Sequence, residues 1–288
     1  MAYVQQTRTS NLYSVRFDPT REAAVGPPTP VTRGSREAWL PDISPDGKWV
    51  TFASAGKQED IFVSRVDGAE LRQLTDDTYK DRGPRWSPDG KQIAFFSDRS
   101  GKYQIWTIKP DGSGLRQLSD DRWALQGPNW SPDGARLAAL RPFPPEVFVL
   151  EVAKPWKDQA PQSLPPPGQG GAQFWPSSWS PDGRRLAGYH MVDGSFAGVV
   201  IYSFDTRRYQ KLTEFGHAPR WLSDSRRLLF NHQGKLYLVD SLTKNVHQVA
   251  IAPRYEINPW LFGLSRDNRL IVFSVASTEA DIWQMNLD

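Results

Sequence analysis

Short apolar runs, each followed by a polar turn, dominate this chain. Ile93-Ala94-Phe95-Phe96 and Ile105-Trp106-Thr107-Ile108 are two of these runs, and the second is apolar at nearly every position. A continuous run of this kind is typical of a strand in a sheet that is covered on both faces. No 12-residue segment carries a convincing helical period. The pattern therefore predicts an all-β protein with close to no helix.

The runs belong to a repeat. WSPDGKQIAF begins at Trp86 and WSPDGARLAA at Trp130, and related phrases occur before and after them. The leading Ser residues, separated by 43, 44, 49, 43 and 42 residues, are Ser44, Ser87, Ser131, Ser180, Ser223 and Ser265. This period matches a propeller blade of four short strands. The sequence thus predicts a six-bladed β-propeller of four-stranded antiparallel blades, in which each blade runs from an inner strand to an outer one.

The Ser-Pro-Asp-Gly phrase is suited to a hairpin turn between the first two strands of a blade. Pro presets the backbone for the turn, and Gly takes the left-handed position that closes it. The turn carboxylates raise the alternative of calcium binding, and they are Asp46, Asp89, Asp133 and Asp182. We interpret each Asp instead as capping its own turn through its side chain.

The repeats predict a single domain over residues 1–288, with the six repeats in 33–288. A Pro- and Gly-rich stretch at 153–171 predicts an exposed surface loop. Asp281–Asp288 reads as a third strand without an outer partner, and residues 1–32 read as strands without inner partners. Pairing of the two ends predicts a clasp that closes the ring and hides both sheet edges. The pattern leaves open which N-terminal strand makes the clasp, and whether both form part of a seventh blade.

The succession WSPDG, IAF, S, IW, DG and LRQLT resembles the repeat of TolB-like, WD40-related propellers over about residues 30–288. The same repeat occurs in the propellers of prolyl-oligopeptidase-type enzymes. The opening NLYSVRFDPTREAAVGPPTPVT resembles propellers that are fused behind bacterial Ser/Thr kinase domains or winged-helix regulators. The resemblance implies the fold, and it implies a propeller that serves as a sensor or as a surface for a partner.

Composition limits the partners. The chain has 35 Lys and Arg against 32 Asp and Glu, without a block of like charges, so we expect no nucleic-acid partner. No run of 18 apolar residues occurs, which predicts no membrane insertion. The first residues lack the apolar segment of a signal peptide, and the pattern leaves the cytoplasm and the periplasm open. There is no Cys, which excludes disulfides and thiol catalysis.

The search for catalytic chemistry finds little. The sequence has no Gly-x-Ser-x-Gly elbow, no phosphate-binding loop and no dinucleotide fingerprint. His190, His217 and His232 fall at one face of neighbouring repeats, where a metal site is the alternative to surface or hydrogen-bonded histidines. We expect no catalytic residue, no metal and no cofactor.

The loops that lead from an outer strand to the next inner strand converge on the mouth of the channel. They carry an aromatic set of mixed charge, which is typical of a surface for a protein, a peptide or a small ligand. The predicted binding residues are Trp39, Asp81, Arg82, Trp123, Gln126, Trp175, His217, Asn258 and Trp260. We therefore predict a monomeric, non-catalytic scaffold or sensor. The alternative is a metal-dependent hydrolase or lactonase in the channel, which would need buried acidic or His ligands around the axis.

Overall fold

The computed structural model describes residues 2–34, 37–56, 58–167, 172–251, 257 and 262–284, with side chains described between residues 9 and 276. Strands make up nearly all of its regular structure, beside a single short 3₁₀ helix, η1 (Trp156–Asp158), in the described ranges. This confirms the expected scarcity of helix. In those ranges, no helix has the length and the apolar composition needed to cross a membrane.

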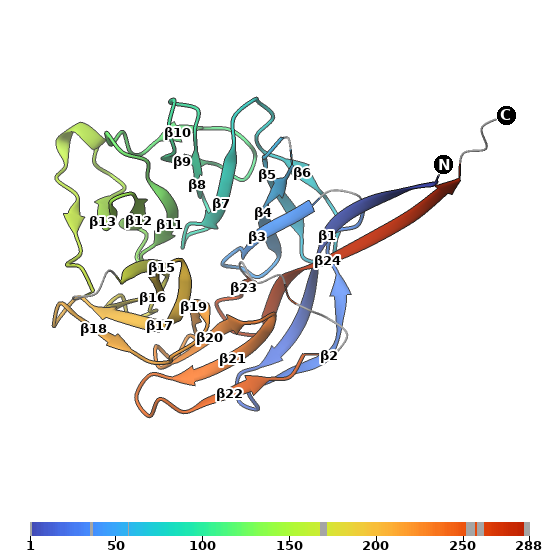
Figure 1. Ribbon diagram of the computed structural model, residues 1–288. Helices are drawn as coiled ribbons and strands as arrows, with labels where there is room; N and C mark the ends of the chain where they lie inside the picture. The colour runs from blue at the N-terminus through green and yellow to red at the C-terminus, as the bar shows by residue number, and fades with distance from the viewer. Residues whose placement is uncertain are drawn as a thin grey trace.

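Four separate four-stranded antiparallel sheets form the larger part of the molecule, and their innermost strands are β7, β11, β15 and β19. The sheets surround a central axis (Figure 1). Their strands are β7 (Asp81–Trp86), β8 (Ile93–Ser97), β9 (Gln104–Ile108) and β10 (Arg116–Gln117); β11 (Gln126–Trp130), β12 (Arg136–Pro142), β13 (Pro145–Glu151) and β14 (Gln162–Ser163); β15 (Gln173–Trp179), β16 (Arg185–Val192), β17 (Ser195–Ser203) and β18 (Arg208–Lys211); β19 (His217–Trp221), β20 (Arg227–His232), β21 (Lys235–Asp240) and β22 (Val246–Val249).

The first repeat, the last repeat and the N-terminal strands share one eight-stranded sheet. Its strands are β1 (Ala2–Asp18), β2 (Ala23–Pro30), β3 (Glu37–Ile43), β4 (Trp49–Ala55), β5 (Ile61–Arg65), β6 (Arg72–Gln73), β23 (Phe262–Leu264) and β24 (Leu270–Gln284). A single parallel pairing, Ser10 with Glu37, joins β1 to β3. The prediction of six separate four-stranded blades is therefore wrong: the described strands form four such blades and this merged sheet.

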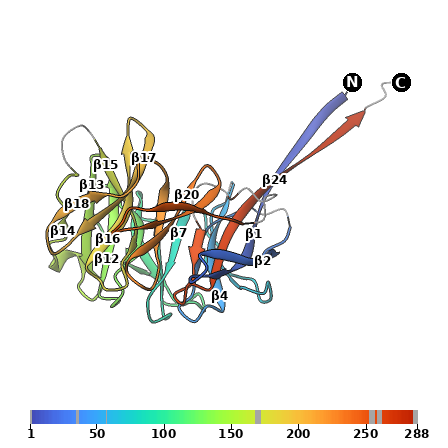
Figure 2. The same cartoon turned by 90° about the horizontal axis from the view of Figure 1, so that it is seen from below.

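The two ends of the chain pair with each other. β1 runs antiparallel to β24 from Ala2 opposite Gln284 to Arg16 opposite Leu270, and β2 pairs with the other edge of β1. Strand β24 thus begins next to β23, as the second strand of the last repeat, and continues along β1. The prediction that residues 281–288 form a third strand is wrong for the described residues 281–284. The β1–β24 ribbon extends well beyond the disc (Figures 1 and 2).

The Ser-Pro-Asp-Gly turns have the predicted chemistry. Their Gly residues have positive φ, between 70° and 72°, at Gly47, Gly90, Gly134 and Gly183. In the first turn, Asp46 accepts hydrogen bonds from the Ser44 hydroxyl at 2.5 Å and from the Lys48 backbone at 3.1 Å. The Asp residues of the other three turns accept bonds in the same way, which confirms the capping role.

Two expectations about the repeats need correction. In the fifth repeat, Leu222 takes the backbone position that Ser44 has in the first, since the Leu222 amide donates to the Arg227 carbonyl as Ser44 donates to Trp49. The anchor at Ser223 is therefore one residue too late. The described part of the stretch 153–171 is mostly exposed, as expected, but it is not all loop, since it contains η1 and the outer strand β14.

The antiparallel order of the strands gives the disc two faces. We call the face with the Ser-Pro-Asp-Gly turns, residues 44–47, 87–90, 131–134 and 180–183, the turn face. The opposite face, at which the inner strands begin and the second strands end, is the loop face. Buried apolar side chains fill the space between neighbouring sheets, as Ala53, Ile61 and Phe95 do between the merged sheet and the blade of β7.

Candidate functional site

A cavity of about 410 Å³ lies at the channel end that opens on the turn face. Its wall consists of the last residues of the inner strands and of the turns that follow them. The polar wall residues from the strands include Asp42, Arg85, Asn129, Ser178 and Arg220, and indole rings and prolines frame them at Trp86, Trp130, Trp179, Trp221, Pro45, Pro88, Pro132 and Pro181.

Two buried guanidinium groups lie in this cavity wall, one from β7 and one from β19. Arg85 and Arg220 are each only 8% exposed. Arg220 donates from Nε to the Phe262 carbonyl at 3.3 Å and from Nη1 to the Ser177 carbonyl, so it links β19 to β23 and β15. Its Nη2 atom, and the Nη1 atom of Arg85, are buried and have no hydrogen-bond partner among the described residues.

The charge in the cavity wall is positive. Among the described residues of the wall there are three Arg side chains, Arg85, Arg220 and Arg266, and one carboxylate, Asp42, which gives a formal charge of +2. Asp42 is 3.8 Å from the Arg85 guanidinium. The pKa of Arg220 is lowered to about 9, mainly by burial and in part by the nearby positive charge of Arg85, while Asp42 acts in the opposite sense. Arg220 is still protonated at neutral pH, so the two guanidinium groups repel each other across the cavity.

This cavity was not predicted from the sequence, although one position of the repeat supplies residues of its wall. The wall positions Arg85 and Asn129 come immediately before the Trp of the WSPDG phrase. The Trp side chains pack between sheets, and successive residues of a strand point in opposite directions, so the residue before each Trp faces the channel. Reading this one position along the repeats gives Asp42, Arg85, Asn129, Ser178 and Arg220.

Those of the residues singled out by the sequence that the structure describes lie at the other end of the channel, on the loop face, and do not line the cavity. Asp81 is completely buried and accepts two hydrogen bonds from Arg99. Arg82 pairs with Glu59, and its guanidinium lies 5.9 Å from the ring centre of Trp39. The structure thus brings Trp39 and Arg82 together, with both side chains partly buried.

The other predicted residues differ in exposure. Trp123 is 42% exposed. Gln126 and Trp175 are half-buried, and Trp175 stacks on Tyr189 with ring centres 6.2 Å apart. His217 is buried, and burial lowers its pKa to about 4, with the charge of His232 adding to the effect. Asn258 and Trp260 lie outside the described residues. The binding role of this set stays a prediction.

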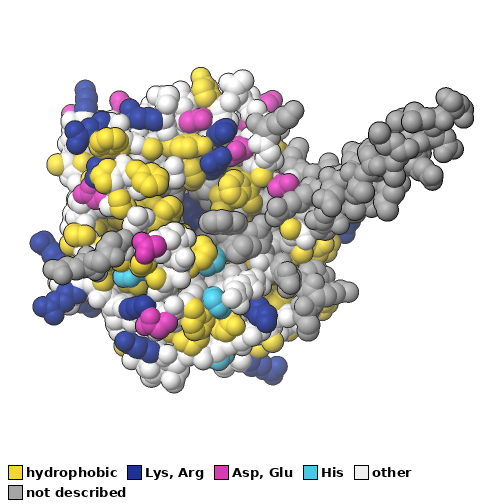
Figure 3. All heavy atoms as spheres, in the orientation of Figure 1, with side chains coloured by type: hydrophobic (Ala, Val, Ile, Leu, Met, Phe, Trp, Pro, Cys, Tyr) yellow, Lys and Arg dark blue, Asp and Glu magenta, His cyan; other side chains and the backbone are white. Residues whose placement is uncertain are grey.

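Exposed aromatic side chains gather on the loop face. Four aromatic side chains in the described part are exposed: Tyr79, Trp123, Phe143 and Phe196. Tyr79 and Trp123 precede the inner strands β7 and β11, while Phe143 and Phe196 lie where β12 passes to β13 and β16 to β17. All four positions belong to the loop-face end of the strands. Hydrophobic side chains cover much of the surface seen in Figure 3, with Lys and Arg mainly toward its edge.

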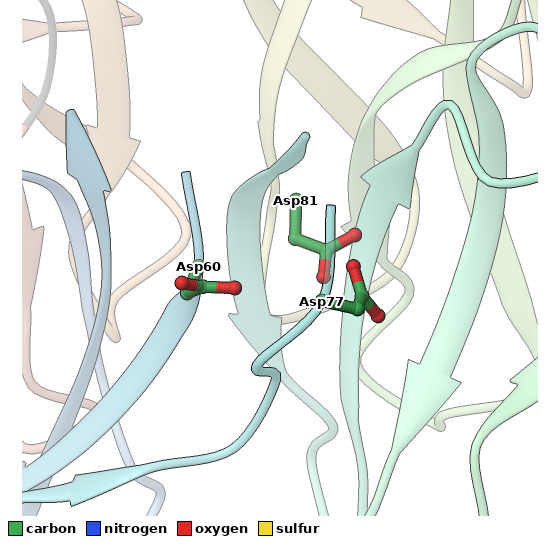
Figure 4. A group of neighbouring side chains, drawn as sticks. All are labelled: Asp60, Asp77 and Asp81. Atoms are coloured by element: carbon green, nitrogen blue, oxygen red, sulfur yellow. The ribbon is translucent and has the colours of Figure 1, made fainter. Parts of the chain in front are cut away.

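Three acidic side chains lie together near the start of β7. One carboxylate oxygen each of Asp60, Asp77 and Asp81 lies within 4.8 Å of the others (Figure 4). Arg99 already pairs with Asp81 at 2.6 Å and with Asp77 at 3.2 Å. Burial raises the pKa of Asp60, which accepts hydrogen bonds from Gln73 and Thr75. Carboxylates at this spacing are a possible cation site, but a protein cation occupies two of them here.

Residues 21–149 match the model of the TolB β-propeller domain family. This chain has a TolB-like β-propeller fold. The TolB-like propeller superimposes on a protein of Agrobacterium tumefaciens classed as TolB with a TM-score of 0.73, covering 94% of this chain and 99% of that one at 15% identity. Identity at this level shows the fold alone.

Curated relatives match shorter segments of the TolB-like propeller. Uncharacterized protein Atu1656 of Agrobacterium fabrum is 36% identical over 88 residues, which are 30% of this chain and 28% of the relative. Uncharacterized peptidase YuxL of Bacillus subtilis is 36% identical over 74 residues, 25% of this chain and 11% of the peptidase. The matches therefore span under a third of either relative.

The same fold also occurs in an enzyme made of little else. An oligogalacturonate lyase of Vibrio parahaemolyticus has a TM-score of 0.54 with the TolB-like propeller, at 11% identity, covering 95% of this chain and 98% of the lyase. The fold is thus compatible with both binding and catalytic roles.

Proposed function

We propose that this TolB-like propeller is a non-catalytic binding module that holds a protein or peptide partner on its loop face. The observation that carries the proposal is the position of the exposed aromatic rings. Tyr79, Trp123, Phe143 and Phe196 come from different loops and hairpins, yet all belong to the loop-face end. Exposed aromatic groups gathered on one face are typical of surfaces that bind proteins, since large rings supply much of the binding energy.

Rigid neighbours support these rings. The Phe196 ring stacks on the buried His217, with ring centres 4.1 Å apart and the planes inclined by 27°. The Arg99 guanidinium lies 5.6 Å from the ring centre of Tyr79. Rings that are held in place before binding lose less conformational entropy when a partner arrives. His217 thus contributes to the loop face by supporting Phe196.

Mixed charge around the rings favours a polypeptide over a nucleic acid. Arg122 lies 5.5 Å from the ring centre of Trp123, while Arg82 and Arg99 are paired with carboxylates. A surface for a phosphate backbone needs several unpaired basic groups in a row. The paired cations of the loop face leave its aromatic rings as the main source of affinity.

A peptide library displayed on phage and selected against the folded chain tests this proposal. The selected peptides are then titrated by calorimetry into the wild type and into the triple variant Trp123→Ser, Phe143→Ser, Phe196→Ser. Each lost ring should cost about 2 kcal/mol of binding free energy, which corresponds to roughly 30-fold in affinity.

The matched control replaces exposed apolar residues elsewhere. Leu71→Ser and Leu115→Ser change side chains that are 50% and 43% exposed and precede the outer strands β6 and β10, near the turn face. Peptide affinity should not change in this control. Unchanged affinity in the aromatic triple variant would contradict the proposal, and stoichiometric metal in the purified protein would favour the hydrolase or lactonase alternative.

A further inference from the structure

The cavity on the turn face is a second site, independent of the loop-face surface. We propose that it binds an organic anion whose carboxylate or phosphate group is held by Arg85 and Arg220. The proposal rests on four features of the cavity: hydrogen-bond donors without acceptors, positive charge, its place in the repeat, and the composition of its wall.

Unused donors are the first feature. Arg220 Nη2 and Arg85 Nη1 are buried without a hydrogen-bond partner among the described residues. The indole Nε1 atoms of Trp86 and Trp221 are also buried and unpaired there, but the equivalent atoms of Trp130 and Trp179 donate to carbonyls of the preceding sheet at 3.0 Å and so point between the sheets. Buried donors are nearly always paired in native proteins, and an anion between the two guanidinium groups would supply acceptors for Arg220 Nη2 and Arg85 Nη1.

Charge is the second feature. The described wall residues have a formal charge of +2. The one carboxylate among them, Asp42, lies 3.8 Å from Arg85 and also accepts a hydrogen bond from the Trp86 backbone at 2.9 Å. Two guanidinium groups in a buried site repel each other unless an anion lies between them. Planar guanidinium groups bind carboxylate and phosphate oxygens with good geometry.

The repeat itself argues against a purely structural role. Asn129 and Ser178 occupy the same position of the repeat as Arg85. Asn129 and Ser178 donate to a carbonyl of the next sheet, as Arg220 Nε does, so the fold needs a donor at this position but not a cation. The positive charges of Arg85 and Arg220, and their unpaired Nη atoms, go beyond this shared bond.

The wall favours a ligand with an apolar body. Tryptophan and proline side chains line the entrance, and the volume of about 410 Å³ is in the range of small-molecule sites. Benzoate and phenyl phosphate are suitable probes, because each carries an aromatic ring and one anionic group. Benzamide has nearly the same shape as benzoate without the charge.

Calorimetric titration of the folded chain tests the site. We expect benzoate or phenyl phosphate to bind with one-to-one stoichiometry and benzamide to bind at least tenfold more weakly. The tighter of the two anions identifies the preferred group. Asp42→Asn removes the competing carboxylate and should tighten the binding of either anion by about tenfold, which damage to the fold would not do.

Arg220→Gln should weaken the binding of the anions by at least tenfold. Arg184→Gln is its control, since Arg184 is exposed on the turn face and does not line the cavity. If Arg220→Gln does not fold, the anion affinity of Asp42→Asn alone tests whether the anion binds at this site. The proposal is overturned by equal affinities for benzoate and benzamide, by an absence of binding of both anions to the wild type, or by unchanged affinity in Asp42→Asn. None of these measurements involves the loop face, so this proposal and the proposed function can fail separately.

Discussion

Trp123 and Trp175 look equivalent in the sequence, as aromatic residues at the approach to an inner strand. The structure separates them: Trp123 is 42% exposed, while Trp175 is half-buried and stacks on Tyr189. A strand position and its residue type do not determine exposure, because exposure depends on which side chains the neighbouring sheet contributes. The sequence pattern therefore predicted both tryptophans for an aromatic channel mouth but could not rank their exposure.

Alanine at the two tryptophans should have different effects on stability. Trp123→Ala should lower the free energy of unfolding by less than about 1 kcal/mol, because much of the ring is already in water. Trp175→Ala should cost about 2 kcal/mol or more, since it removes stacking and contact with the apolar cluster around Phe174. Urea unfolding of both variants measures the difference. Equal losses of unfolding free energy would contradict the different exposures of Trp123 and Trp175.

His217 makes stability depend on pH. Burial lowers its folded pKa to about 4, against 6.5 for an ordinary His. Above pH 6.5 the group is neutral in both states, and stability is complete. As the pH falls from 6.5 toward 4, the unfolded chain binds a proton that the folded chain does not, so His217 costs up to about 3 kcal/mol of stability.

The variant His217→Gln, which lacks this titration, should lose about 2 to 3 kcal/mol less than the wild type between pH 7.5 and 4.5 in urea unfolding. His247→Gln is the control, because the His247 side chain is 45% exposed. It should follow the wild type. A pH dependence shared by all three proteins would show that His217 is not buried as a neutral group.

At the scale of the strand and turn, local chemistry was predictable. Each Ser-Pro-Asp-Gly turn depends on residues within the turn itself, and the structure confirms both the Gly conformation and the Asp cap. Strand β14 and the length of β24 were not predictable from local pattern. The described β14 pairs with β13, and β24 extends beyond its short pairing with β23 only where it pairs with β1.

Two glycines with positive φ test this distinction between local and tertiary constraints. A Cβ at Gly90 would meet nothing closer than Pro45 Cδ at 3.7 Å, so Gly90→Ala should cost only the backbone strain, about 1 kcal/mol. A Cβ at Gly198 in β17 would lie 1.9 Å from the Thr213 carbonyl oxygen. Gly198→Ala should therefore cost about 3 kcal/mol or more, and similar melting temperatures for the two variants would contradict the packing of β17.

For the whole molecule, the repeat predicted a propeller but not how its sheets are divided. The pairing of Ser10 with Glu37 depends on where the N-terminal strand lies after the ring has closed, and no repeat unit contains that information. The cavity and the loop face likewise combine residues that are far apart in the chain. Of the four exposed aromatic residues of the loop face, the sequence singled out only Trp123, because the exposure of the others depends on which side chains the neighbouring loops contribute. Predicting the cavity required knowing which way the inner-strand residues point.

Ring closure can be tested by deletion. Removing residues 1–32 deletes β1 and β2, exposes the edge of β24, and removes Leu12, Val15 and Phe17 from two apolar clusters. The shortened chain should aggregate or melt at a clearly lower temperature. Removing residues 1–8 deletes only the outer part of the ribbon and should have a small effect. A monomeric chain with an unchanged melting temperature after the longer deletion would contradict the closure.

Hydrogen exchange on the folded chain with a selected peptide bound tests the central claim, a partner on the loop face, most directly. Binding there should slow backbone exchange in the loop-face segments 76–80, 120–125, 143–144 and 193–196 and leave the turns at 44–47, 87–90, 131–134 and 180–183 unchanged. Protection confined to those turns, with exchange in the loop-face segments unaltered, would contradict the account.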